Sequence, residues 1–230
     1  MELTTKIPQA HQGPVYDVDF SSPQFDSIIC SCGFDKAVCL WKNTNSTYSK
    51  VFEYKDHTNV VTSVSFSHEL KDVLLFVSCC LDGNIAVHQY KNGMFSSQQI
   101  QAHTNGVTCV SFNPNKPMNF MTCGNDYNIK IWTYVAEEDN WISETLDKSE
   151  SAVKDIAYKP NDISDSFVAC NEDGEVLLWR KSDGKWESSL LLSHSCGIEK
   201  VSWNSNGNAI IAVSSSGEEI LINEDVFNTK

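Results

Sequence analysis

The most constraining feature of this chain is a short apolar pattern that recurs five times at an almost constant interval. The pattern is a valine, a second valine three residues later and an aromatic residue two further on, with conservative variants. Its copies are Val15-Val18-Phe20, Val61-Val64-Phe66, Val107-Val110-Phe112, Val153-Ile156-Tyr158 and Ile198-Val201-Trp203. They begin at positions 15, 61, 107, 153 and 198, so the intervals are 46, 46, 46 and 45 residues. This regularity predicts an array of similar structural units.

A second anchor is an aspartate that precedes a run of alternating apolar residues in each of the first four copies. The four residues are Asp35, Asp82, Asp126 and Asp173. Alternation with a period of two indicates β-strands that bury one face. In the fifth copy, Gly217 and Asn223 stand where the aspartate and the terminal tryptophan are expected. We therefore expect the fifth repeat to lack both, with its last strand running through Ile220 and Ile222.

A third anchor lies four residues before each copy of the apolar pattern. It is His11, His57, His103, Ser149 and His194 in turn. A period near 45 residues, with histidine near the start and tryptophan near the end, is typical of WD repeats, each of which forms a four-stranded blade. We predict an all-β WD-repeat β-propeller with five blades of its own, in a single domain of residues 1–230. The repeats are expected at about 11–54, 57–101, 103–146, 149–192 and 194–223, with residues 2–8 as an extra outer strand.

The recurring histidine, serine and aspartate resemble the parts of a hydrolytic triad. A triad needs one nucleophile and one oriented base, whereas this set recurs in several repeats. WD-repeat families use it as a structural hydrogen-bond network, which pairs buried polar groups. We predict no catalytic residue and interpret His88, which replaces the second tryptophan, as a substituted blade position. The predicted network is His11, Ser31, Asp35, Trp41, His57, Ser78, Asp82, His103, Thr122, Asp126, Trp132, Asp173, Trp179 and His194.

Nine cysteines invite a metal-site or disulfide hypothesis. Four of them, Cys32, Cys79, Cys123 and Cys170, each lie three residues before a repeat aspartate, so they are spread one per blade. A zinc site is expected to have close pairs of ligands along the chain, and the adjacent Cys79 and Cys80 do not suit a shared tetrahedral ion. The sequence therefore predicts buried small side chains, with no metal, no cofactor and no disulfide.

The charge of the chain narrows its partners. Asp and Glu number 30 against 17 Lys and Arg, a formal net charge of −13. This argues against the basic surface that nucleic acid or anionic lipid would need. No apolar stretch reaches 18 residues, so no direct membrane insertion is expected. Residues 1–8 have no apolar segment of the kind found in secretory signals, so we expect a cytoplasmic protein.

Several stretches carry a more specific likeness. They are residues 11–15 (HQGPV), 22–25 (SPQF), 35–42 (DKAVCLWK), 102–107 (AHTNGV), 128–132 (NIKIW), 178–180 (LWR) and 184–186 (GKW). On these stretches the chain resembles a WD-repeat family, the small propeller subunit of the COPII outer coat, which is shared with the Y-shaped outer-ring complex of the nuclear pore. The resemblance covers nearly the whole chain.

The resemblance implies a function and a way of binding. The family's propeller has six repeats and is open on one side, where an α-solenoid partner inserts a blade. This chain begins where the second repeat of the family would begin, so one repeat is expected to be missing. We expect an open ring that is completed by a coat subunit or a scaffold nucleoporin, because unpaired strand edges and apolar blade faces are adhesive. The predicted seam for this partner is Leu3, Thr5, Ile7, Ile220, Ile222 and Val226.

The predicted function is that of a non-enzymatic scaffold in the COPII coat, in the nuclear pore outer ring, or in both. The expected locations are coat vesicles at the cytoplasmic face of ER exit sites and the nuclear pore. Two alternatives stay open at this point. One is another WD-repeat adaptor, such as the sibling nucleoporin propeller. The other is a hydrolase that uses one histidine, serine and aspartate set.

Overall fold

The computed structural model describes residues 6–7, 9–44, 47–68, 70–146, 149–162 and 165–223. In these residues the chain forms nineteen β-strands and one short 3-10 helix, η1 (Pro23–Phe25). None of the described elements is a helix that could reach across a membrane. The chain divides between Val107 and Thr108 into two compact units. The single domain of residues 1–230 therefore stays a prediction.

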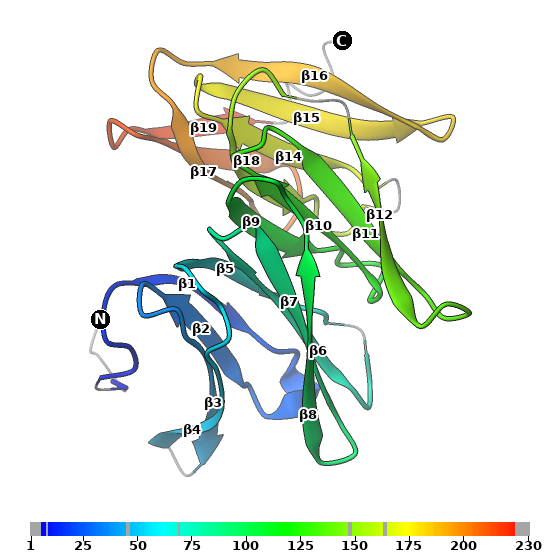
Figure 1. Cartoon of the computed structure of the whole chain (residues 1–230). Helices are drawn as coiled ribbons and strands as arrows, with labels where there is room; N and C mark the ends of the chain where they lie inside the picture. The colour runs from blue at the N-terminus through cyan, green and yellow to red at the C-terminus, as the bar shows by residue number, and fades with distance from the viewer. Residues whose placement is uncertain are drawn as a thin grey trace. The chain divides into compact units, whose positions relative to one another are not determined.

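The first unit contains two antiparallel sheets in which strands that follow each other in the sequence are neighbours (Figure 1). The first sheet has the order β1 (Val15–Phe20), β2 (Ile29–Gly33), β3 (Val38–Thr44) and β4 (Thr47–Tyr54). The second has the order β5 (Val61–Phe66), β6 (Leu74–Cys80), β7 (Asn84–Lys91) and β8 (Met94–Gln101). Each sheet is a complete four-stranded blade.

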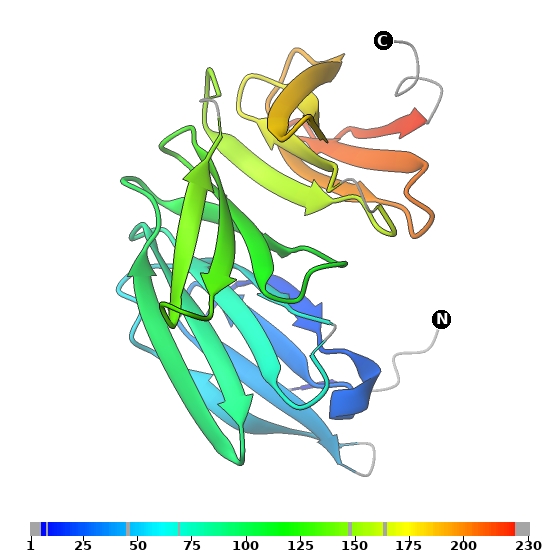
Figure 2. The same cartoon turned by 90° about the vertical axis from the view of Figure 1, so that its right-hand side faces the viewer.

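The second unit contains the remaining three antiparallel sheets (Figure 2). The third sheet consists of β9 (Val107–Phe112), β10 (Asn119–Gly124), β11 (Ile129–Val135) and β12 (Asn140–Thr145). The fourth consists of β13 (Val153–Tyr158), β14 (Phe167–Asn171), β15 (Glu175–Ser182) and β16 (Lys185–Ser193). The fifth has three described strands, β17 (Ile198–Trp203), β18 (Ala209–Ser214) and β19 (Glu219–Asn223). The predicted all-β class of WD-repeat propeller, with five blades, is confirmed.

A β-bulge explains the spacing of the recurring apolar pattern. Residues three apart on a regular strand point to opposite faces, yet the two valines of the pattern are buried together. In β5, the register to β6 shifts between Val61 and Ser63, and the same shift occurs in β1, β13 and β17. The extra residue returns Val61, Val64 and Phe66 to one face, where they are 0%, 3% and 0% exposed. The pattern is thus the sequence signature of a bulged first strand.

Within each unit, a blade buries the apolar face of the first strand of the blade that follows it. In the first unit, Val61 and Val64 lie in one cluster with Val38 and Leu40 of the preceding blade. In the second unit, the equivalent residues of β13 and β17 lie in clusters with apolar residues of the second and third strands of the blade before. This repeated contact buries apolar surface between neighbouring blades and so stabilises their packing.

Aspartates reinforce these contacts between blades. Asp17 Oδ2 accepts hydrogen bonds from Ser63 Oγ at 2.8 Å and from the Val64 amide at 3.0 Å. In the second unit, Asp155 Oδ2 accepts from the Val201 amide at 2.9 Å, and Lys200 Nζ lies 3.4 Å from its Oδ1. These two aspartates occupy the same position of their repeats and link each first strand to the next. Burial raises the pKa of Asp155, so its ionised form depends on these partners.

We expect Asp155→Ala to lower the free energy of unfolding by about 1–3 kcal/mol, because it leaves the buried Val201 amide without an acceptor. Asp155→Asn should lower it less, since an amide oxygen can still accept from that amide. Urea denaturation of the full chain measures both. An alanine variant as stable as the asparagine variant would show that this hydrogen bond does not hold the two blades together.

Candidate functional site

The first blade contains the complete hydrogen-bond network predicted from the repeats. Trp41 Nε1 donates to Ser31 Oγ at 2.9 Å, Ser31 Oγ lies 2.7 Å from His11 Nε2, and His11 Nδ1 lies 2.9 Å from Asp35 Oδ1. The indole can only donate, so the serine hydroxyl donates to the histidine and the histidine donates to the aspartate. The Gln12 amide donates to the other carboxylate oxygen at 2.9 Å. The network therefore fastens the segment before β1 to the turn between β2 and β3.

The second blade has the same elements in a different arrangement. Ser78 Oγ lies 2.8 Å from His57 Nε2 and 2.9 Å from His88 Nε2, and His88 Nδ1 lies 2.8 Å from Ser97 Oγ. Asp82 accepts from the amide and hydroxyl of Thr58 at 3.1 and 2.7 Å. The Nδ1 atom of His57 is buried and has no hydrogen-bond partner. Burial lowers the pKa of His57, and it lowers the pKa of His88 to about 3, so both rings are neutral at physiological pH.

The third and fifth blades keep parts of the network. In the third, Trp132 Nε1 donates to Thr122 Oγ1 at 3.0 Å, and Asp126 accepts from the Asn128 amide at 3.2 Å; His103 is buried. In the fifth, His194 Nε2 lies 2.9 Å from a carboxylate oxygen of Glu218.

Glu218 corrects the expectation that the fifth repeat has lost its acid. The alignment at Gly217 concealed it, because this turn differs from the others. The spacing to the histidine could have revealed it: His194 and Glu218 are 24 residues apart, as are His11 and Asp35.

The fourth blade does not form the network. The structure places Asp173 in the turn between β14 and β15 with its side chain exposed, and Ser149 stands in the place of the histidine. Ala169 occupies the position of Ser31 and Thr122, opposite Leu177 on β15. The buried Trp179 Nε1 and Ser149 Oγ have no hydrogen-bond partner, and a void of about 10 Å³ lies between these side chains. The predicted roles of Asp173 and Trp179 in a network are corrected accordingly.

This defect predicts a stabilising substitution. A serine at position 169 would place a hydroxyl where Ser31 accepts from Trp41, so Ala169→Ser should raise the free energy of unfolding by about 1 kcal/mol. The matched control is Ala212→Ser, at the same position of the fifth blade, where no indole faces it. The control should lower the free energy of unfolding, because its buried hydroxyl lacks that donor. Thermal or urea unfolding distinguishes the two; equal effects would contradict the assignment.

The first blade exposes an apolar face that the other blades bury. Val15, Val18 and Phe20 are 47%, 55% and 54% exposed, whereas the equivalent residues of β5 are covered by the blade before them. Tyr16 and Phe34 beside them are also more than half exposed, at 52% and 55%. We call Val15, Val18 and Phe20 the first-blade face. The predicted seam omitted it, although the repeat alignment makes these residues the equivalents of the buried Val61, Val64 and Phe66.

Ile7 lies in a different place, over the outer part of the same blade. It packs with Ala10 against a cluster of Ala37, Cys39 and Trp41. Phe52 of β4 packs in the same manner on the second blade, with its ring centroid 6.1 Å from that of Phe76. Ile7 thus occupies the position of an outer strand, although residues 6–7 are not in a strand. Leu3 and Thr5 of the predicted seam lie outside the described residues.

The last blade ends in an unpaired edge within the described residues. Its sheet has the order β17-β18-β19, so β19 has a neighbour on one side. Ile222 is 5% exposed and lies in the cluster with the fourth blade, and Ile220 packs against the same cluster. The large apolar residues of this blade that are exposed are Leu221 and Ile211, at 65% and 42%.

We therefore revise the predicted seam from Ile220 and Ile222 to Leu221 and Ile211. Ile222 pairs with Ile210 as Trp179 pairs with Phe167, so Ile222, and not Asn223, stands at the tryptophan position, which faces the preceding blade. Val226 lies outside the described residues. We call Ile211, Leu221 and the open edge of β19 the last-blade edge.

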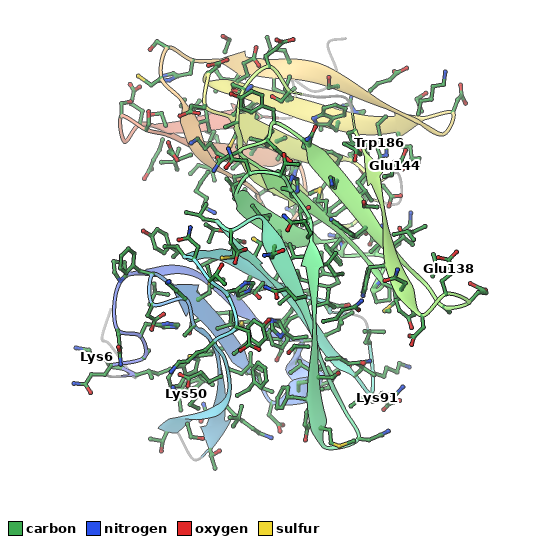
Figure 3. The ribbon with its side chains drawn as sticks, in the orientation of Figure 1. Lys6, Lys50, Lys91, Glu138, Glu144 and Trp186 are labelled. Carbon is green, nitrogen blue, oxygen red and sulfur yellow. The ribbon has the colours of Figure 1, made fainter. Side chains whose placement is uncertain are left out.

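A cavity of about 500 Å³ lies in the second unit. Its lining includes Lys116, Tyr158, Lys181, Glu144 and Trp186, the last two labelled in Figure 3. Among the described residues that line it there is no serine, cysteine or histidine, and no residue of the predicted network is one of them. The recurring sets lie in separate blades and fasten turns, which favours a structural role over a hydrolytic one. All nine cysteines are thiols, and eight of them are buried.

Comparison with known proteins gives a consistent result. The family model described as "WD domain, G-beta repeat" matches residues 2–42, 48–89 and 95–133. The protein transport protein sec13 of Aspergillus oryzae is 30% identical over 92% of this chain and 81% of its own length. The protein of the same name from Aspergillus fumigatus is 29% identical over 92% of this chain and 78% of its own. The SEC13 homolog of Drosophila melanogaster is 27% identical over 93% of this chain and 66% of its own.

Proposed function

Because the chain belongs to the Sec13 family of WD-repeat proteins, we propose that it is a non-enzymatic scaffold subunit of a protein transport coat. Its partner is an α-solenoid subunit of the COPII outer coat, or the related scaffold nucleoporin of the nuclear pore outer ring. That partner donates strands to this propeller. The chain then acts at the cytoplasmic face of ER exit sites, at the nuclear pore, or at both.

The observation that carries this proposal is the contrast between equivalent residues of the first two blades. Val18 and Phe20 are 55% and 54% exposed, while Val64 and Phe66 are 3% and 0% exposed. A side chain that the repeat makes apolar in every copy is expected to be buried in every copy. Contiguous apolar surface of this kind is typical of interaction sites. A donated strand with apolar side chains supplies the cover that β2 and β3 supply to the second blade.

Part of the first blade is already covered by residues of this chain, which limits the surface that the partner must cover. Ile7 and Ala10 already cover Cys39 and Trp41 in the outer part of the first blade. The first-blade face lies on the inner strand and is uncovered. The partner is therefore expected to contribute inner strands, while this chain contributes the position of the outer one.

The last-blade edge supports the proposal separately. The main-chain groups on the open side of β19 have no strand partner among residues 6–223 that the structure describes. An added strand would satisfy them by β-augmentation, with Leu221 and Ile211 giving apolar contacts.

The proposal is tested by co-expressing the full chain with the blade-forming segment of its α-solenoid partner. We expect a stable one-to-one complex and a higher yield of folded chain than without the segment, because binding to the folded state stabilises it by mass action. A chain that melts at the same temperature with and without the segment, and that does not retain it on size exclusion, contradicts the proposal.

A further inference from the structure

The second blade contains three potential metal ligands at one point. A ring nitrogen of His57, the Sγ of Cys80 and a carboxylate oxygen of Asp82 all lie within 4.8 Å of one another. His57 and Cys80 are 3% and 0% exposed, and Asp82 is partly exposed. The cluster joins the segment before β5 to the turn between β6 and β7. An ion could therefore enter from the side of Asp82.

Among the residues that the structure describes, a group of this kind occurs in the second blade alone. Cys80 pairs with Val61 on the neighbouring strand, as Gly33 pairs with Val15 in the first blade. In the first blade the histidine bonds to the aspartate directly, at 2.9 Å. In the second blade Asp82 is bonded by Thr58 and by the thiol of Cys80. The His57 Nδ1 is left buried without a partner, which is a costly state for a polar atom.

Because His88 replaces the tryptophan, the hydrogen bonds of this network can be donated in the opposite direction. An indole can only donate to the serine, whereas a neutral imidazole nitrogen can accept from it. His57 Nε2 then donates to Ser78, Ser78 donates to His88 Nε2, and His88 Nδ1 donates to Ser97. This direction leaves a lone pair on His57 Nδ1, the ring nitrogen that has no hydrogen-bond partner and can join Cys80 and Asp82 as a ligand. The other direction would leave an N–H group there with no acceptor.

We propose that His57 Nδ1, Cys80 Sγ and Asp82 bind one zinc ion, with water as the fourth ligand. Nitrogen, thiolate and carboxylate are the donors that Zn²⁺ takes in proteins, usually in a tetrahedron. The carboxylate argues against Cu(I), and the thiolate argues against Mg²⁺ or Ca²⁺. The bond from His57 Nε2 to Ser78 is the outer contact that holds a ligating histidine in place. On binding, the thiol proton of Cys80 is released to solvent and the Sγ–Zn bond forms.

The test uses the full chain without a histidine tag, in metal-free buffer with a phosphine reductant. Co²⁺ serves as the spectroscopic probe and Zn²⁺ as the competitor. We expect one Co²⁺ per chain, with a thiolate-to-cobalt charge-transfer band that Zn²⁺ abolishes, and a higher melting temperature with Zn²⁺. The absence of that band in the unsubstituted chain would overturn the proposal, whatever the variants do.

Two variants identify the site. Cys80→Gly introduces the residue that the first and third blades have at this position, Gly33 and Gly124. It should fold, lose the charge-transfer band and bind Zn²⁺ at least about tenfold more weakly. The matched control is Cys79→Ser, since Cys79 lies in contact with Ser63 and Thr62 instead; this variant should keep the band. Equal binding by the Cys80→Gly chain, or loss of the band in Cys79→Ser alone, would show that the metal binds elsewhere.

Discussion

Phe20→Glu is expected to abolish binding of the partner segment while leaving the chain folded. Phe20 is 54% exposed on the first-blade face, so in the free chain the carboxylate remains in water. In the complex it would be buried against apolar strands without a partner, which is strongly unfavourable. We expect the dissociation constant to rise at least about 100-fold, or about 2.7 kcal/mol. Isothermal titration with the partner segment measures it.

The repeat supplies a matched control for this experiment. Phe66→Glu makes the same change at the same position of the second blade, where the side chain is 0% exposed. It should prevent the chain from folding, because the charge then enters the core between the first two blades. Lys91→Glu, at the exposed end of β7 (Figure 3), should change neither folding nor binding. A Phe20→Glu chain that binds as tightly as the unsubstituted one would remove the first-blade face from the proposed interface.

Gly174→Ala is expected to lower the free energy of unfolding by about 3 kcal/mol or more. Gly174 has φ of +89°, and an added Cβ would lie 2.3 Å from the His194 carbonyl oxygen and 2.5 Å from that of Cys196. The backbone of residues 194–196, which joins β16 to β17, would have to move. The measurement is urea unfolding of the second unit within the full chain.

Gly184 provides the comparison, because it has φ of +81° but open space around its Cα. Gly184→Ala should cost only the left-handed backbone conformation, about 1–2 kcal/mol. The difference between the two variants isolates the close approach of the chain at Gly174. If both variants lower the free energy of unfolding equally, the carbonyl groups of residues 194 and 196 move aside without a measurable loss of stability.

The sequence predicts the fold well because its strongest signals are local and repeated. The spacing Val61, Val64 and Phe66 identifies the first strand of a blade, and the bulge that gives this spacing its meaning is the same wherever the shift is seen. The aspartate and the alternation after it locate the turn and the third strand. Repetition makes the boundaries of each copy easier to align, since the same contacts recur along the chain.

The site was harder to predict, because the exposure of a strand's side chains depends on whether another blade packs against that strand. Val18 and Val64 are equivalent in sequence, yet Val18 is 55% exposed and Val64 is 3% exposed, because the first blade packs against Val64. The prediction that Ile220 and Ile222 form the seam is wrong because it assigned them to the wrong face of the strand. A shift of one residue exchanges the two faces of a strand. Asn223 was aligned with the tryptophans, whereas Ile222 holds that position.

The hydrogen-bond network shows why a repeat cannot be read as uniform. In the second blade His88 replaces a tryptophan, and in the fourth blade Ala169 replaces a serine. Each substitution changes which polar atoms of the blade have a hydrogen-bond partner. The cluster of His57, Cys80 and Asp82 could not be found by ligand spacing along the chain, because sheet pairing brings its members together. The substitutions are visible in the sequence, but which polar atoms they leave without a partner depends on contacts between strands.

Site-specific photo-crosslinking from position 18 tests the central claim most directly. A photoreactive amino acid replaces Val18 in the full chain, which is mixed with its α-solenoid partner and irradiated; the same amino acid at Lys91 is the control. Mass spectrometry identifies the crosslinked peptides. We predict a covalent adduct between position 18 and the blade-forming segment of the partner, and none from position 91. A partner that co-purifies with the chain but gives no adduct at position 18 would contradict the account.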